Sequence, residues 1–202
     1  ILEKENITSY HSTGRSFAFY IESYGNEIIR KLTSSSKDFF INNSNFDNQN
    51  SILRPRGVLH LASDKQSNDL LESYKELTKI NKNLNLLNSN ETLKILPCLN
   101  EKYINSSIHD YEACDIDVNY LYNIYLNEFK KNKGSIKTNI KINNVLNKNN
   151  DWQINCQSDT FYCKLVINAA GAWCDEVANI FNAKPINIVP KKRTVFCFKP
   201  LN

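Results

Sequence analysis

The sequence predicts a mixed α/β fold over its 202 residues. Helical and extended patterns alternate along the chain, and three short strands separated by turn residues follow one another over 136–168. Apolar residues make up 41% of the chain, which is enough for one globular domain or two small ones. We therefore expect an α/β architecture that contains an antiparallel meander.

The first forty residues predict one short strand and two helices. The stretch "ILE" (1–3) has the pattern of a buried strand that ends on an acid. In "SYHSTGRSFAFYIESYG" small polar residues precede an aromatic run, so we expect a helix that begins near Ser12 and extends to about Tyr24. Residues 26–40 predict a second helix, with apolar residues along one side.

The middle of the chain predicts a strand followed by three helices. The strand is "LRPRGVLHLA" (53–62), and helical patterns cover 66–80 and 89–96. The clearest helix is 115–134, where apolar residues recur at helical spacing between a predicted N-cap at Asp117 and a final glycine.

The last third predicts strands, one helix and a final strand. Short strands are expected near 136–146, 152–156 and 160–168. The stretch "LVINAAGAWCDEVANIF" then predicts an apolar strand, a turn of small residues and a helix from about Trp173. The final strand is "RTVFCF" (193–198).

Composition argues against several classes of function. The net charge of +4 comes from scattered lysines rather than a dense basic block, which does not favour nucleic-acid binding. The six cysteines form no CxxC pair and have no nearby His at metal-ligand spacing, so we expect reduced core cysteines in a cytoplasmic protein. No apolar run reaches the about 20 residues of a membrane span. The chain starts with Ile1 and contains no Met, so we expect it to be part of a longer protein.

Three stretches could contact a nucleotide, although each also has a simpler interpretation. An acid at the end of a strand, such as Glu3, can accept hydrogen bonds from ribose, but such acids are common. In "NAAGAW", Gly171 permits close approach of a ligand or serves only a tight turn. A pyrophosphate could bind at "HSTGRS", through the N–H groups of a helix start, the hydroxyls and Arg15. The alternatives are that Ser12 and Thr13 only cap the helix and that Arg15 forms a surface ion pair.

The order of these stretches resembles the D-amino-acid oxidase superfamily of FAD-dependent enzymes. "LEKE…YHSTGRS", "RPRG", "DIDVNYL", "NAAGAWCD" and "PKKRT" follow one another over essentially the whole chain. They are most similar to the D-amino-acid dehydrogenase branch, whose pattern reads HSTGRSAA; Phe17 departs from it by replacing a small residue. The resemblance implies that the family's GxGxxG unit precedes Ile1 and that its last FAD-binding segment follows Asn202.

The resemblance implies FAD as the cofactor and no metal. It implies a Rossmann-type FAD-binding domain (1–50 and 100–187) with an interleaved antiparallel substrate domain (51–99 and 188–202). Glu3 would meet the ribose, and the backbone of Ile142 would meet the adenine. The residues implied to bind FAD are Glu3, Lys4, Ser12, Thr13, Gly14, Arg15, Ser16, Phe17, Ala18, Ile142, Ala170, Gly171 and Trp173.

The resemblance also implies a substrate pocket formed by Phe19, Tyr24, Val58 and Arg193. Arg193 would hold the substrate carboxylate through two hydrogen bonds, although locally it could equally be an exposed arginine. Relatives that oxidise cationic substrates carry an acid where Val58 stands. We therefore expect neutral D-amino acids to be preferred over D-arginine and D-lysine, unless Glu22 reaches the pocket.

The implied reaction is oxidation of a D-amino acid at Cα. A hydride passes to flavin N5, and the imino acid hydrolyses to a 2-oxo acid and ammonia. No residue, and none of the three histidines, matches a catalytic role. The electron acceptor would be a quinone or oxygen. Oxidation of a secondary amine such as sarcosine or glycine, oxidation of a 2-hydroxy acid, and a non-catalytic FAD-binding role are the alternatives.

Overall fold

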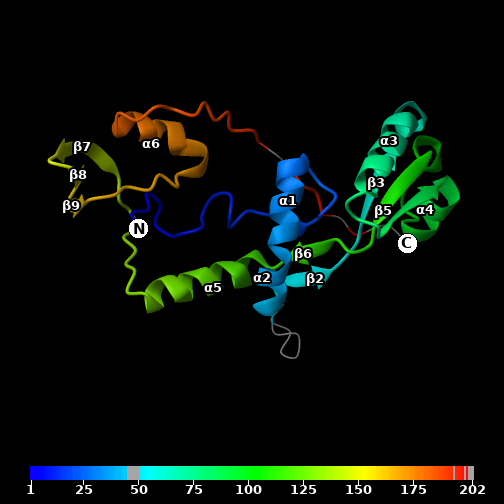
Figure 1. The fold of residues 1–202 in the computed structure, drawn as a ribbon, viewed down its shortest axis with the longest axis horizontal. Coiled ribbons are helices and arrows are strands. Elements are labelled where there is room, and N and C mark those ends of the chain that lie inside the picture. The colour runs from blue at the N-terminus through cyan, green and yellow to red at the C-terminus, as the bar shows by residue number, and fades with distance from the viewer. Residues whose placement is uncertain (45–50, 193, 198, 200–202) are drawn as a thin grey trace. The chain divides into compact units, whose positions relative to one another are not determined.

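A computed structural model describes residues 1–44, 51–192, 194–197 and 199 of the chain (Figure 1). The chain divides into two compact units. One unit combines Ile1–Ser12 with Phe129–Phe196, and the other contains Thr13–Glu128. Each unit has its own strands and its own packing.

The second unit contains a small antiparallel sheet near its start. Strands β1 (Phe19–Tyr20), β6 (Cys114–Ile116) and β2 (Leu53–Pro55) lie in the order β1-β6-β2. Tyr20, Ile52 and Leu53 form its buried centre. Burying one such side chain stabilises a protein by about 1.5–3 kcal/mol, so this cluster anchors the segment that follows the predicted FAD-binding stretch.

Three helices belong to the region around this sheet. The predicted helix over 26–40 is present as α1 (Glu27–Ser35) and α2 (Lys37–Asn42), which meet at Ser36. Helix α5 (Val118–Lys131) confirms the helix expected over 115–134. The carboxylate of Asp117 accepts a hydrogen bond from the backbone N–H of Tyr120 at 2.9 Å, as the predicted N-cap requires.

A second antiparallel sheet of this unit has the order β3-β5-β4. Its strands are β3 (Val58–Ala62), β5 (Ser106–Asp110) and β4 (Leu84–Asn88). The predicted strand over 53–62 is therefore divided between two sheets, because the chain turns at Gly57, which has a positive φ of 79°.

Two helices pack on the second sheet, as Figure 1 shows. They are α3 (Ser67–Leu77), preceded by a 3₁₀ turn, and α4 (Ser89–Ile95), and they confirm the helices expected over 66–80 and 89–96. Leu77 from α3 meets Leu84 and Ile108 from the sheet in a buried cluster. Helix and sheet thus share one apolar layer.

The first unit contains the predicted meander. Strands β7 (Ile142–Lys148), β8 (Asp151–Cys156) and β9 (Thr160–Cys163) form an antiparallel sheet in chain order. A 3₁₀ turn (Gly171–Trp173) leads into α6 (Cys174–Ile180), which confirms the expected helix. Mixed α/β structure with antiparallel sheets confirms the predicted fold class.

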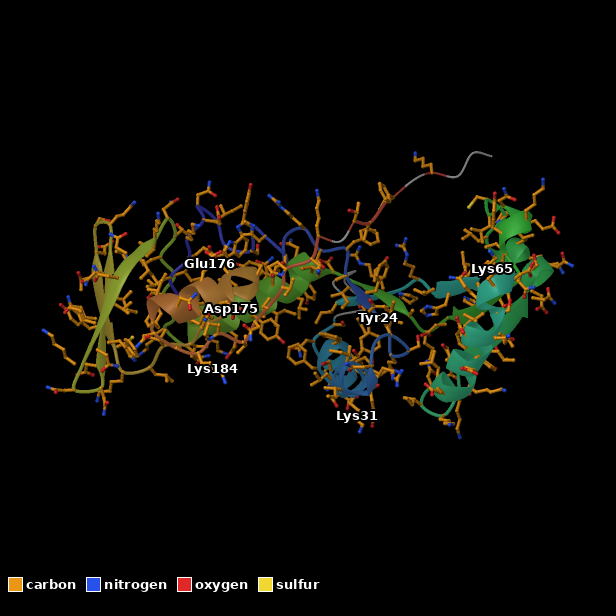
Figure 2. The ribbon with its side chains drawn as sticks, turned by 90° about the horizontal axis from the view of Figure 1, so that it is seen from above. Tyr24, Lys31, Lys65, Asp175, Glu176 and Lys184 are labelled. Atoms are coloured by element: carbon orange, nitrogen blue, oxygen red, sulfur yellow. The ribbon has the colours of Figure 1, made fainter. Side chains whose placement is uncertain are left out.

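Asp175, at the start of α6, fastens the segment that follows this helix (Figure 2). Its two carboxylate oxygens accept hydrogen bonds from the backbone N–H groups of Ile186 and Ile188, each at 2.9 Å. An acid in the first turn of a helix also complements the positive end of the helix dipole. One side chain therefore holds a segment that forms no regular secondary structure.

The helix expected from Ser12 to Tyr24 is wrong. Residues 9–15 form turns, Phe19 and Tyr20 lie in β1, and the chain turns again before α1. The aromatic run is extended because Tyr20 reaches the buried cluster and pairs with Cys114 of β6. Pairing with a distant strand overrides the local helical pattern.

Two predicted strands differ from the structure as well. The apolar stretch before Asn168 is irregular rather than a strand. Of the strand expected over 193–198, residues 194–197 are irregular, and its two end residues lie outside the described residues.

The cysteines are only in part the core residues that we expected. All six have free thiols; Cys174 is buried, whereas Cys98 and Cys197 are exposed. Among the described residues, no helix has the length and apolarity that crossing a membrane requires.

Candidate functional site

In the first unit, Glu3 lies in a segment whose backbone pairs with residues 137–140. Leu2 bridges Lys137 in parallel, and the N–H of Glu3 donates to the carbonyl of Lys137 at 2.8 Å. The half-buried Glu3 carboxylate accepts a hydrogen bond from the backbone N–H of Glu5 at 2.9 Å, and Lys4 beside it is exposed. A carboxylate held in this way can accept hydrogen bonds from ribose hydroxyls, and the predicted ribose contact stays a prediction.

The turn over "NAAGAW" is held by its own polar groups. The Asn168 side chain accepts a hydrogen bond from the N–H of Ala170 at 3.2 Å and donates one to the carbonyl of Cys174 at 2.8 Å. Gly171 has a φ of 56°, in the left-handed region that disfavours residues with a Cβ. A Cβ added at Gly171 would meet no heavy atom within 4 Å. The backbone therefore needs glycine here, and the space in front of it is open.

His11 joins two of the predicted FAD-binding stretches. Its ring lies against the Trp173 ring, with centroids 4.4 Å apart and planes inclined by 50°. Its Nε2 lies 2.9 Å from a carboxylate oxygen of Glu5. This contact brings the beginning of "HSTGRS", including the exposed Ser12, to the turn that carries Gly171.

The sequence assigned no role to His11. In the structure its ring packs against Trp173 and so holds the two stretches together. The contact with Trp173 depends on two residues far apart in the chain, so no local pattern could reveal it.

Ile142 lies at the first position of β7, opposite Cys156, and is half-buried. Its predicted adenine contact stays a prediction.

In the second unit, the rest of the motif forms an exposed turn. The N–H of Ser16 donates to the carbonyl of Thr13 at 3.3 Å, and the residues from Thr13 to Phe17, Gly14 and Arg15 among them, are exposed. Because no helix starts here, our expectation that helix-start N–H groups bind the pyrophosphate is wrong. Hydroxyl and guanidinium groups are the residue types that bind phosphate, so the predicted phosphate contacts of this stretch stay a prediction.

Phe17, Ala18 and Phe19 lie on and beside β1. The carbonyl of Ala18 accepts a hydrogen bond from the N–H of Ile116 at 2.9 Å. The rings of Phe17 and Phe19 meet edge to face, with centroids 5.2 Å apart. Sheet pairing therefore fixes the backbone that presents these two rings.

Tyr24, which is labelled in Figure 2, lines a cavity of about 260 Å³ in the second unit. The tyrosine lies in the turn after β1 and is half-exposed. Ser23, His60 and Ile108 are among the other lining residues. Val58, the other described residue of the predicted pocket, is half-buried in β3 and pairs with Asp110 of β5.

A buried polar group that the sequence did not reveal lies beside this cavity. The Ser23 hydroxyl donates to Oδ2 of Asp110 at 2.6 Å, and Asp110 is only 1% exposed. Its other oxygen, Oδ1, has no hydrogen-bond partner among the described residues. His60 lies 3.5 Å from the Ser23 hydroxyl; burial lowers its pKa, and the charge of Asp110 opposes this shift only in part.

Glu22, which we considered as a possible acid of the substrate pocket, is already engaged. Its carboxylate accepts hydrogen bonds from the Tyr20 hydroxyl at 2.8 Å, and from Ser34 and Lys37 at 2.9 Å each. Burial raises the pKa of Glu22, but these hydrogen bonds, with that from Lys37 the strongest, lower it overall. Glu22 therefore belongs to a structural ion pair.

Arg193, the residue predicted to bind the substrate carboxylate, lies outside the described residues.

A family model described as "FAD dependent oxidoreductase" (DAO) matches residues 1–202. The chain belongs to this family. FAD is therefore confirmed as the cofactor of the family to which the sequence pointed, whereas the dehydrogenase branch is a finer statement than this match supports.

Solved structures show the same fold at low sequence identity. The FAD-bound L-α-glycerophosphate oxidase from Mycoplasma pneumoniae is 20% identical, with a TM-score of 0.73 over 89% of this chain and 49% of its own. Glycine oxidase from Geobacillus kaustophilus is 15% identical, with a TM-score of 0.74 over 90% and 51%. L-amino acid deaminase from Proteus vulgaris is 14% identical, with a TM-score of 0.71 over 91% and 44%. The chain thus spans about half the length of these oxidoreductases.

The residues of the first unit fit FAD. Gly171 leaves open the space that a Cβ would fill, and the Glu3 carboxylate is held by the N–H of Glu5. The Trp173 ring, held by His11, offers a flat apolar surface. An acid, an open glycine turn and an aromatic face are groups that a dinucleotide requires.

Proposed function

We propose that this oxidoreductase oxidises a D-amino acid at Cα, as do the D-amino-acid dehydrogenases that its motifs resemble. The contact between His11 and Trp173 is the observation that supports this most, because it joins "HSTGRS" to "NAAGAW". These are the two motifs that carry the resemblance. Structures of similar fold include enzymes named for amino acids, glycine oxidase and L-amino acid deaminase, and this agrees with the proposal.

FAD, when bound, supplies a two-electron acceptor for the hydride that leaves Cα. The substrate nitrogen loses a proton, and water then converts the imino acid to a 2-oxo acid and ammonia. In this proposal Glu3 and the Gly171 turn hold the cofactor, while Thr13–Ser16 supply hydroxyls and one cation to its phosphates. The protein contributes by orienting Cα and excluding water.

Four residues orient the substrate in this proposal. Arg193 binds the substrate carboxylate, and Phe19, Tyr24 and Val58 line the pocket for its side chain. Removing one partner of a buried charge pair costs about 2–5 kcal/mol, so Arg193→Ala should lower kcat/KM by about 30-fold to several thousandfold. Arg193→Lys should recover only part of this, because an ammonium cannot form two parallel hydrogen bonds. A variant within twofold of the wild type would remove Arg193 from the pocket.

Anaerobic reduction of the bound flavin tests the reaction directly. The FAD-loaded full-length protein is mixed with a panel of D-amino acids, the matching L-amino acids, sarcosine, glycine and a 2-hydroxy acid. Loss of the oxidised-flavin absorbance with D-amino acids, and not with the others, is the expected result. Faster reduction by sarcosine, glycine or the hydroxy acid would replace the proposal with that chemistry. A flavin that none of these compounds reduces would favour a non-catalytic role.

A further inference from the structure

Arg56 places a cation directly over Phe17 and Phe19. Its guanidinium carbon lies 5.4 Å from the centroid of the Phe17 ring and 5.7 Å from that of Phe19. The two rings meet edge to face, so they form a corner that the guanidinium covers. A cation over aromatic faces is attracted by their quadrupoles. The proposed side-chain pocket, of which Phe19 is a part, therefore has a positive group at its wall.

The backbone around Arg56 holds this position. The N–H groups of Arg56 and Gly57 both donate to the carbonyl of Ala113, at 3.1 and 2.9 Å. Ala113 is buried and immediately precedes β6, the strand that also pairs with Phe19. The backbones of Arg56 and Phe19 are thus both held by the segment 113–116, and the ion pair with Asp115 of β6 orients the guanidinium.

One edge of the Arg56 guanidinium is available to a ligand. Nη1 donates to a carboxylate oxygen of Asp115 at 2.8 Å, whereas Nε and Nη2 make no hydrogen bond within the described part of the chain. The Arg56 side chain is 47% exposed. An arginine binds a carboxylate through two parallel N–H groups, and Nε with Nη2 form such an edge.

We propose that Arg56 makes the substrate pocket selective for an anionic side chain, so that acidic D-amino acids are the preferred substrates. This inference rests on the proposed function. The side-chain carboxylate would approach the Nε–Nη2 edge, with the width of the guanidinium between it and Asp115. A cationic side chain would instead meet Arg56 as a like charge, and the apolar Val58 would offer it no compensation.

A comparison of D-glutamate with D-glutamine tests the proposal, because the two differ little in size and differ in charge. In the FAD-loaded full-length protein, we expect kcat/KM to be at least about tenfold higher for D-glutamate, as for a charge-assisted hydrogen bond. Arg56→Gln should lower kcat/KM for D-glutamate by about 10- to 100-fold and leave that for D-glutamine within about twofold.

Arg54→Gln is the matched control. Arg54 has the same charge and a similar ion pair, with Asp117 at 2.8 Å, and in the described part of the structure no aromatic ring lies beneath its guanidinium. This variant should keep the preference for D-glutamate. Equal losses in the two variants would assign the effect to general surface charge and overturn the proposal.

The outcomes also separate this inference from the proposed function. If neutral D-amino acids reduce the flavin but D-glutamate is no better than D-glutamine, the role of Arg56 is wrong and D-amino-acid oxidation stands. If no D-amino acid reduces the flavin, both are wrong. Binding of D-glutamate by Arg56→Gln as tightly as by the wild type, measured from the perturbed flavin spectrum, would likewise contradict the role of Arg56.

Discussion

The predicted cofactor-binding stretches and the two sheets of the second unit differ in the exposure of their side chains. From Ser12 to Phe17, and again from Gly171 to Trp173, every residue is exposed. In the sheets of the second unit, Tyr20, Ile108 and Asp110 are almost wholly buried. The exposed stretches present hydroxyls and aromatic rings at the surface, whereas the sheets bury their side chains against one another.

If the exposed stretches bind FAD as we propose, ligand binding and stability depend on neighbouring but separate parts of the chain. Only a few residues separate the exposed Phe17 from the buried Tyr20 and Ser23. Substitutions in the exposed stretches should therefore change FAD affinity and leave the free energy of unfolding almost unchanged. Substitutions in the sheets should do the reverse.

The largest expected effect is that of Ile52→Ala. Ile52 is 0% exposed, and removing its side chain leaves a cavity beside Tyr20 and Leu53, which should lower the free energy of unfolding by about 2–5 kcal/mol. Urea unfolding measures this loss. The matched control is Ile28→Ala on the exposed side of α1, which should change it by no more than about 0.5 kcal/mol. Similar losses in both variants would mean that Ile52 is not a core residue.

Ser23→Ala should lower the free energy of unfolding by about 1–3 kcal/mol, because buried Asp110 would lose its hydroxyl donor. Ser16→Ala is the exposed counterpart: its stability should stay within about 0.5 kcal/mol of the wild type, while FAD binds more weakly. Urea unfolding and flavin fluorescence titration measure the two quantities. A Ser16→Ala variant that loses stability but keeps its FAD affinity would contradict the separation of FAD binding from stability.

Gly171→Ala should cost only about 1 kcal/mol of stability, because the new Cβ meets no protein atom and only the left-handed backbone is strained. FAD affinity should fall at least about tenfold if the cofactor fills the open space there. Gly134→Ala is the control, since its Cβ would collide with the Phe129 ring and should reduce stability without weakening FAD. Unchanged FAD affinity in Gly171→Ala would contradict the fit of this turn to FAD.

The smallest effect is a pH dependence that comes from His60. Burial lowers its pKa in the folded protein, so the unfolded chain binds the extra proton more readily. Stability should therefore fall as pH decreases through the ordinary histidine pKa of about 6.5, and level off below the folded value. Urea unfolding at several pH values should show a shallower fall in His60→Gln. An identical pH profile in that variant would contradict this origin.

Local patterns were sufficient for the long helices and the meander. Helix α5 follows from apolar residues at helical spacing between Asp117 and a terminal glycine, and β7, β8 and β9 follow from short extended runs between turn residues. The motifs that carry the family resemblance were also recognisable, because they consist of particular residue types in a fixed order. These features depend on neighbours within a few residues, so the sequence displays them directly.

The sequence could not reveal what depends on distant partners. The aromatic run became strand β1 because Phe19 and Tyr20 pair with Asp115 and Cys114, and the same pairing removed the helix start that we had expected to bind phosphate. The partners Ser23 and Asp110 are 87 residues apart, and no pattern in either segment signals the other.

The sequence alone determined the family, the meander and the long helices, because each rests on residue types at short spacing. The tertiary structure alone decided three further features: the contact of His11 with Trp173, the buried Asp110, and the position of Arg56 over Phe17 and Phe19. The physical reason is that packing and hydrogen bonding between distant segments fix these groups, and the free energy of such contacts exceeds the weak local preferences that a sequence displays.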